Sequence, residues 1–74
     1  MSGSIDRLVS MANDIADYFR SEPDHAAAVE GVRNHLQRFW DPRMRRKLVA
    51  HLAEHGGEGL SELARAAVAK LAAA

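Results

Sequence analysis

The chain of 74 residues contains no cysteine, so disulfide bonds and zinc or iron–sulfur sites built on thiolates are excluded. It also lacks any apolar run near the roughly 20 residues that a membrane-spanning helix requires. Its first residues do not combine a basic region with a hydrophobic core, as a secretory signal does. We therefore expect a cytoplasmic protein without a membrane partner.

Catalytic patterns are missing as well. No serine or histidine stands in an arrangement typical of nucleophilic catalysis, and the glycine-rich stretch at 56–59 lacks the Lys-Ser/Thr ending of a phosphate-binding loop. A chain this short buries only about 60% of the surface that it exposes when unfolded, which leaves little room for a deep pocket. We therefore expect a binding or structural module that is not an enzyme by itself.

The net charge is zero, with ten Lys and Arg residues against ten Asp and Glu, but the charges are unevenly spread. Residues 1–37 carry three basic and six acidic residues, residues 38–55 carry five and two, and residues 56–74 carry two of each. This pattern predicts a polarised surface with an acidic first half and a basic middle. Domains that bind nucleic acid are usually more basic overall.

Apolar residues recur at helical spacing along nearly the whole chain, and no segment alternates as a strand does. Caps, prolines and glycines divide this pattern into four segments. These signals are Ser4, Pro23 and Asp24, Asp41-Pro42, and Gly56-Gly57. The sequence therefore predicts a small all-α, four-helix bundle-like single domain. Its helices are expected at about 4–20, 25–40, 42–55 and 60–72.

Each expected helix has one apolar face that predicts the core. The inward positions are Ile5, Leu8, Val9, Ala12, Ile15, Ala16, Phe19, Ala28, Val29, Val32, Leu36, Phe39, Trp40, Met44, Leu48, Val49, Leu52, Leu60, Leu63, Ala64, Ala67, Val68 and Leu71. Gly31 lies inside the second helix, where glycine costs about 1 kcal/mol relative to alanine and is typical of a close approach by a neighbouring helix. Met11 and Tyr18 flank the first apolar stripe and are expected to stay partly exposed.

The stretch RFWDPRMRRK at residues 38–47 holds half of the Lys and Arg residues of the chain. On a helical wheel Arg43, Arg46 and Lys47 share one face of the third helix, while Arg45 lies beside the apolar stripe. Cations in the first turn of a helix oppose its macrodipole, at a cost of about a few tenths of a kcal/mol each. The run is either a solvated basic face or a contact with a partner.

Two large aromatic residues, Phe39 and Trp40, end the second expected helix. Successive helical positions diverge by about 100°, and a helix end seldom buries two such rings fully. We therefore expect one ring, that of Trp40, to lie at an interface, where tryptophan is enriched.

A helix, a tight turn and a basic helix also have the outline of a helix-turn-helix. The turn at Asp41-Pro42 contains no glycine, however, and the expected helix 42–55 has no Asn, Gln, Ser or Thr to read base edges. A nucleic-acid-binding protein is therefore an alternative that the acidic residues of the chain do not favour.

His51 and His55 are spaced i, i+4, as metal-binding pairs often are. No third ligand is evident, and the metalloprotease pattern places its glutamate directly after the first histidine. Histidines near a helix C-terminus are also favoured by the helix dipole. We expect these two to be structural or solvent-facing, and we expect no metal or other cofactor on this chain.

Two segments carry a family resemblance: RLVSMANDIADYF at 7–19 and HLQRFWDPRMRRKLVAHL at 35–52. They contain Met-Ala-Asn-x-Ile-Ala at 11–16 and Phe-Trp-Asp-Pro-Arg-Met at 39–44, and a glycine-rich stretch and a short alanine-rich helix follow. Over residues 5–71 the chain resembles the delta subunit of soluble, NAD-dependent, molybdenum-containing formate dehydrogenases.

The resemblance implies an accessory subunit of an enzyme that oxidises formate to carbon dioxide and passes electrons to NAD. The molybdenum cofactor, iron–sulfur clusters and flavin are expected on larger subunits, in agreement with the lack of cysteine here. This chain is expected to dock on the large subunits, in particular the molybdenum-bearing alpha subunit, and to support assembly or stability. A transient chaperone for molybdenum-cofactor insertion is the alternative.

We expect the partner contact at the corner between the second and third helices, where the Asp-Pro turn would fix the angle. Trp40 would supply an apolar anchor, and Arg43, Arg45 and Arg46 would make charge-assisted contacts around it. Alternatively, Arg45 braces the corner from inside and the aspartate of the turn pairs with an arginine. The candidate partner-binding residues are Asn13, Phe39, Trp40, Arg43, Arg45 and Arg46.

Overall fold

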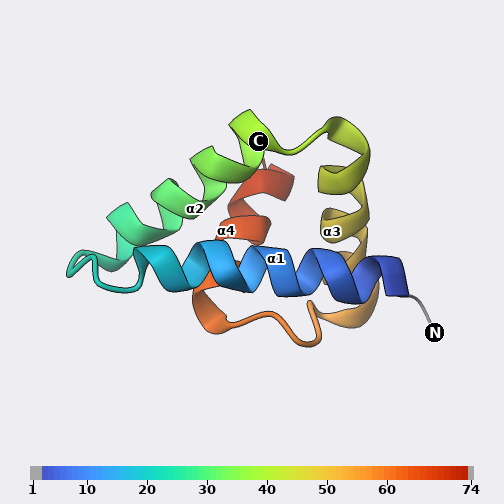
Figure 1. Cartoon of the computed structure of the whole chain (residues 1–74), viewed down its shortest axis with the longest axis horizontal. Helices are drawn as coiled ribbons and strands as arrows, with labels where there is room; N and C mark the ends of the chain where they lie inside the picture. Colours follow the sequence, from blue (N-terminus) through green and yellow to red (C-terminus); the bar gives the residue numbers. More distant parts are fainter. Residues whose placement is uncertain (1–2, 74) are drawn as a thin grey trace.

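The computed structural model describes residues 3–73 (Figure 1). Its helices are α1 (Gly3–Phe19), α2 (His25–Phe39), α3 (Pro42–His55) and α4 (Glu62–Ala73). The described residues contain no strand, and the prediction of a small all-α fold with four helices is confirmed. Within residues 3–73, none of the helices has the length and apolar character needed to cross a membrane.

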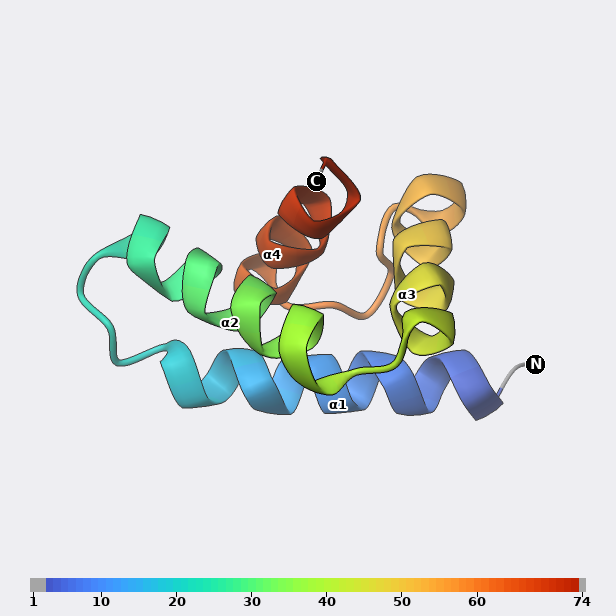
Figure 2. The ribbon, with the colours of Figure 1, turned by 90° about the horizontal axis from the view of Figure 1, so that it is seen from above.

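The longest helix, α1, lies along one side of the molecule, and the other three helices pack against it from the same side (Figure 2). Helices α2 and α3 diverge from the corner that joins them, and α4 lies between them and packs against both. This arrangement leaves the junction between α2 and α3 on the outside of the molecule, away from the loop of residues 56–61 that joins α3 to α4.

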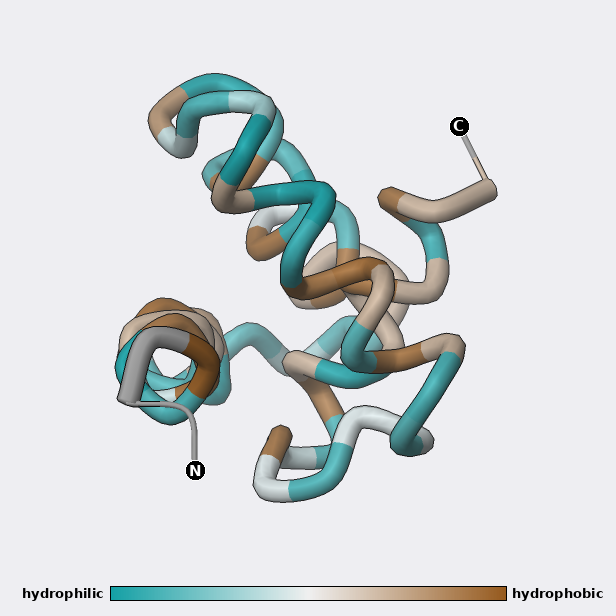
Figure 3. The backbone as a smooth tube through the Cα atoms, turned by 90° about the vertical axis from the view of Figure 1, so that its right-hand side faces the viewer, coloured by the Kyte–Doolittle hydropathy of each residue, from teal (hydrophilic) through white to brown (hydrophobic). Residues whose placement is uncertain are grey.

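The core consists of hydrophobic residues from all four helices and from the connections before α3 and α4. The buried members are Leu8, Ala12, Ala16, Ala28, Val29, Val32, Leu36, Trp40, Leu48, Leu60, Ala64, Ala67, Val68 and Leu71. Seen along its axis, α1 turns its hydrophobic positions toward the other helices (Figure 3). Every predicted inward residue belongs to this core or packs against it, except Phe39.

Gly31 allows the close packing of α2 against the end of α1. A Cβ built at this position would lie 2.5 Å from Cε1 and 2.7 Å from Cδ1 of Phe19. Real Cβ atoms do not approach ring carbons so closely, so the bare glycine backbone is the surface on which the Phe19 ring rests. The close approach predicted for this glycine is confirmed.

Two helix ends follow the signals read from the sequence. Asp24 precedes α2, and its Oδ1 accepts a hydrogen bond from the backbone N–H of Ala26 at 3.1 Å. Helix α3 ends at His55 and is capped by Gly56, which has a left-handed φ of 66° and donates its N–H to the carbonyl of Leu52 at 3.0 Å. The left-handed backbone accounts for glycine at this position.

Two other ends differ from the expectation. Helix α1 begins at Gly3, so Ser4 has a helical backbone and its predicted role as the N-cap is wrong. Helix α4 begins at Glu62, two residues later than expected. The hydroxyl of Ser61 accepts a hydrogen bond from the N–H of Ala64 at 3.2 Å, so Ser61 caps α4 from outside the helix.

Candidate functional site

Helices α2 and α3 meet at a sharp corner, and residues 35–46 form this α2–α3 corner. Trp40 and Asp41 both have extended backbones, with φ −91° and ψ 143° at the first and φ −74° and ψ 161° at the second. The N–H of Trp40 donates to the carbonyl of Leu36 at 3.2 Å and closes α2. Asp41 Oδ1 accepts the N–H of Met44 at 2.9 Å and caps α3. The turn therefore fixes the direction of both helices.

The two aromatic rings of the corner have opposite environments. Trp40 is 6% exposed and belongs to the core, whereas Phe39 is 70% exposed. The prediction that Trp40 supplies the ring exposed for an interface is therefore wrong. A helical wheel treats residue 40 as part of α2, but the chain leaves the helix at this residue, and the extended backbone places the larger ring in the core.

Phe39 has polar aromatic and cationic neighbours on the surface. Its ring centroid lies 4.8 Å from that of His35, and the guanidinium carbon of Arg38 lies 6.0 Å from it. A single exposed hydrophobic residue is common on soluble proteins. The combination of an exposed ring with several arginines is the feature that distinguishes this part of the surface, since aromatic residues and arginine are enriched at protein interfaces.

Arg45 lies inside the corner. Its guanidinium donates hydrogen bonds to the carbonyl of Gln37, at 3.1 Å, and to the carbonyl of Trp40. These carbonyls lie at the C-terminal end of α2, where helix carbonyls lack intrahelical partners and a positive charge is favourable. The alternative in which Arg45 braces the corner from inside is confirmed, so its partners in this structure are backbone groups of the chain itself.

Arg43 and Arg46 are both exposed, but they line different hollows. Lys47 lies with Arg43 and apart from Arg46, so the single basic face predicted for these three residues is divided. Arg43 lines a groove of about 420 Å³ that α3 forms with the start of α1. Arg46 lines a hollow of about 320 Å³ that reaches Leu71 and Ala72 at the end of α4. The first turns of α3 therefore present positive charge on two sides, and the exposed ring of Phe39 lies at the end of α2 within the same corner.

The pKa of Asp41 lies below its ordinary value, chiefly because the carboxylate accepts the backbone N–H of Met44. Desolvation opposes this in part, while the N–H of Arg43 and the positive charges of Arg43 and Arg45 lower the pKa further. The carboxylate is therefore ionised at neutral pH and accepts hydrogen bonds as the cap of α3.

Asn13 lies away from the corner, against the loop of residues 56–61 that joins α3 to α4. Its Nδ2 donates to the carbonyl of Gly59 at 2.9 Å, and its Oδ1 accepts the N–H of Ser61 at 2.8 Å. Figure 1 shows this loop and the α2–α3 corner at opposite ends of α3. The structure therefore does not bring Asn13 together with the other five candidate residues. The sequence did not predict these two hydrogen bonds of Asn13, because their partners lie far away along the chain.

His51, on α3, contacts the same loop. Its Nε2 lies 2.8 Å from the carbonyl of Glu58, and its ring centroid lies 5.7 Å from that of His55. Among residues 3–73, His, Asp and Glu form no group of three or more that could hold a metal ion. The hydrogen bond to Glu58 gives His51 a structural contact, as expected.

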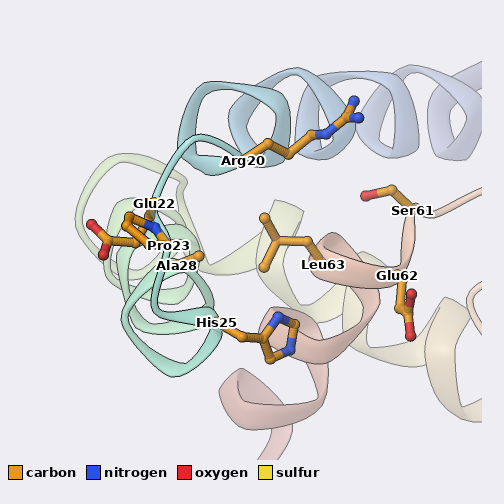
Figure 4. A pocket seen from close by; sticks show the side chains of 8 residues that line it. All are labelled: Arg20, Glu22, Pro23, His25, Ala28, Ser61, Glu62 and Leu63. Atoms are coloured by element: carbon orange, nitrogen blue, oxygen red, sulfur yellow. The ribbon is translucent and has the colours of Figure 1, made fainter.

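Another hollow, of about 580 Å³, lies between the α1–α2 turn and the start of α4 (Figure 4). Its lining includes Arg20, Glu22 and Glu62, whose charged ends point in different directions. None of the six candidate residues lines it. Because its polar groups do not converge, this hollow does not form a site for a defined ligand.

The sequence model of the NADH-dependent formate dehydrogenase delta subunit family, FdsD, matches residues 7–68. This match covers nearly all of α1 and the whole of α2, the corner, α3 and the α3–α4 loop, and it ends within α4. Comparisons with curated proteins and with solved structures give no significant match. The chain belongs to the NADH-dependent formate dehydrogenase delta subunit family.

Proposed function

We propose that this chain is a non-catalytic accessory subunit that docks on the large subunits of a formate dehydrogenase and supports assembly or stability of the complex. Its membership of the delta subunit family makes it a component of such an enzyme. The molybdenum-bearing alpha subunit is the proposed docking partner. The observation that carries the proposal is the ring of Phe39, which is 70% exposed at a corner whose next helix begins with the exposed Arg43 and Arg46.

The proposed contact is favourable on energetic grounds. Complete burial of a phenylalanine side chain contributes about 1.5–3 kcal/mol. Exposed arginines around such a ring can donate charge-assisted hydrogen bonds to carboxylates or carbonyls of a partner. Interfaces often contain a buried aromatic anchor of this kind, ringed by contacts that exclude water.

The corner is ordered before any partner binds. Arg45 and the Asp41 cap fix the backbone on both sides of the turn, and Trp40 attaches it to the core. Association then requires little ordering of the corner, which reduces the entropy lost on binding. A rigid presentation of Phe39 supports a stable subunit contact.

The chemistry of formate oxidation is assigned to the larger subunits. This chain has no cysteine to ligate an iron–sulfur cluster, and its described residues offer no group of three or more metal-ligating side chains. The proposed role of this chain is therefore the contact that its surface makes with the larger subunits.

Co-purification tests the proposed function. The tagged chain would be expressed with the formate dehydrogenase large subunits and followed through size exclusion in moderate salt. We expect stoichiometric co-elution with the active enzyme. A chain that is absent from the finished enzyme, but without which the enzyme lacks molybdenum cofactor, would instead be a maturation factor. A chain that neither co-elutes nor affects the cofactor content would contradict both roles.

A further inference from the structure

A groove of about 420 Å³ lies between the first turns of α1 and the first turns of α3. Figure 2 shows these two segments side by side at the N-terminal end of α1. Leu8, Met11 and Met44 give the groove an apolar lining. Leu8 is buried, while both methionines are half-buried and pack against the edge of the core. Methionine side chains adapt to irregular apolar partners, so this lining suits a docked apolar side chain.

The rim of the groove is mainly positive. Arg7, Arg43 and Lys47 line it together with a single carboxylate, that of Asp41. This carboxylate already accepts the N–H of Met44 as the cap of α3. All three cations are exposed, and with three positive charges against one negative charge the rim has a net charge of plus two. Such a rim attracts a negatively charged partner and repels a basic one.

We propose that this groove binds an acidic segment of a formate dehydrogenase large subunit, which places an apolar side chain between Met11 and Met44 and its carboxylates against Arg7, Arg43 and Lys47. The inference rests on the proposed function and extends it, because it names a second contact surface and the chemistry of its occupant. Arg43 belongs to both proposed surfaces, because it lines the groove and is also a candidate residue of the α2–α3 corner.

Zero-length cross-linking of the complex tests the proposal without altering the chain. A carbodiimide joins a lysine amine to a carboxylate in direct contact, and the chain has two lysines, Lys47 in the groove and Lys70 on α4. We expect mass spectrometry to find Lys47 joined to Asp or Glu of a large subunit, with Lys70 as the internal comparison. A complex in which Lys47 forms no link to a large subunit would overturn the proposal.

Charge reversal measures the contribution of the rim. We expect Arg7→Glu/Lys47→Glu to weaken binding to the purified large subunits by about tenfold or more, because it replaces attraction by repulsion. The control, Arg20→Glu/Lys70→Glu, changes the net charge equally outside the groove and should bind as the unaltered chain does. Arg7→Glu alone serves as a second variant, and circular dichroism checks the helicity of each.

The outcomes separate this inference from the proposed function. If the unaltered chain does not bind the large subunits, the proposed function fails and the inference fails with it. If the unaltered chain and Arg7→Glu/Lys47→Glu bind equally well, the inference alone is overturned. A dimer of the isolated chain that is lost in the same variant would also overturn it, because a second copy would then occupy the groove.

Discussion

The two connections of α3 use their side chains in opposite ways. The backbone of the loop of residues 56–61 is held by side chains of two helices. Asn13 of α1 makes two hydrogen bonds to it, and His51 of α3 makes another. The α2–α3 corner keeps Trp40 and Arg45 inside but leaves the ring of Phe39 exposed.

This difference separates two tasks within a small chain. Side chains that hydrogen-bond to the backbone or pack in the core fix the fold, and they are the groups whose loss should lower stability. Side chains that are exposed without such contacts contribute little to stability and are available to a partner.

The largest difference in stability is expected between substitutions of the two aromatic rings of the corner. Trp40→Ala removes a buried aromatic side chain and should lower the free energy of unfolding by about 3–5 kcal/mol. Phe39→Ala removes an exposed ring and should change it by less than about 0.5 kcal/mol. Chemical denaturation of both variants measures the difference. Equal destabilisation by the two substitutions would show that the inward and outward assignment of the rings is wrong.

The loop should depend on Asn13. Asn13→Ala removes the two hydrogen bonds that Asn13 makes to the loop, and we expect a loss of about 1–3 kcal/mol in unfolding free energy. Asn34→Ala, at an exposed position of α2, is the matched control and should be neutral or slightly stabilising. Binding to the large subunits should be retained in Asn13→Ala. A variant that keeps its stability but loses binding would instead place Asn13 on a partner surface.

Reversal of two charges at the corner should act on binding rather than on folding. Arg43→Glu/Arg46→Glu should weaken association with the large subunits by about tenfold. We expect α3 to remain helical, because both positions are exposed and a carboxylate at position 43, in the first turn, interacts favourably with the helix dipole. Co-purification and circular dichroism measure the two effects separately. Unchanged association would contradict a docking role for these arginines.

The smallest effect concerns the cap of α3. Because the folded pKa of Asp41 lies below the ordinary value of 3.8, its contribution to stability is complete above pH 3.8 and is lost as the pH falls through the folded pKa. Asp41→Asn retains a capping oxygen that does not titrate. We therefore expect the unaltered chain to lose slightly more stability on acidification than Asp41→Asn. Thermal unfolding of both chains, followed from neutral pH to below pH 3.8, measures this difference in stability. Identical acid sensitivity of the two chains would contradict the role of the ionised cap.

Local patterns were sufficient to predict most of the fold. Four apolar stripes predicted four helices, and Asp24 and Asp41 were correctly read as caps because a cap depends on residues two or three positions away. Phe39 was wrongly predicted to face inward. Trp40 was predicted both as an inward position and as an interface anchor, and only the inward position is confirmed, because the outcome depends on the single residue at which α2 ends.

The candidate site was harder to predict than the fold. The partners of Asn13 are 46 and 48 residues away in the sequence, so no local pattern indicates them. The exposed positions of Arg43 and Arg46 follow from helical spacing, whereas the groove beside Arg43 exists only because α1 packs next to α3.

The affinity of Phe39→Ala for the purified large subunits tests the docking role of the corner most directly. Tyr18→Ala is the matched control, because Tyr18 is 80% exposed and lies near the far end of α1. We predict a loss of about tenfold or more for Phe39→Ala, as for a central aromatic contact of an interface, and no change for Tyr18→Ala. Equal affinity of Phe39→Ala and the unaltered chain would contradict the assignment of the α2–α3 corner as the docking surface.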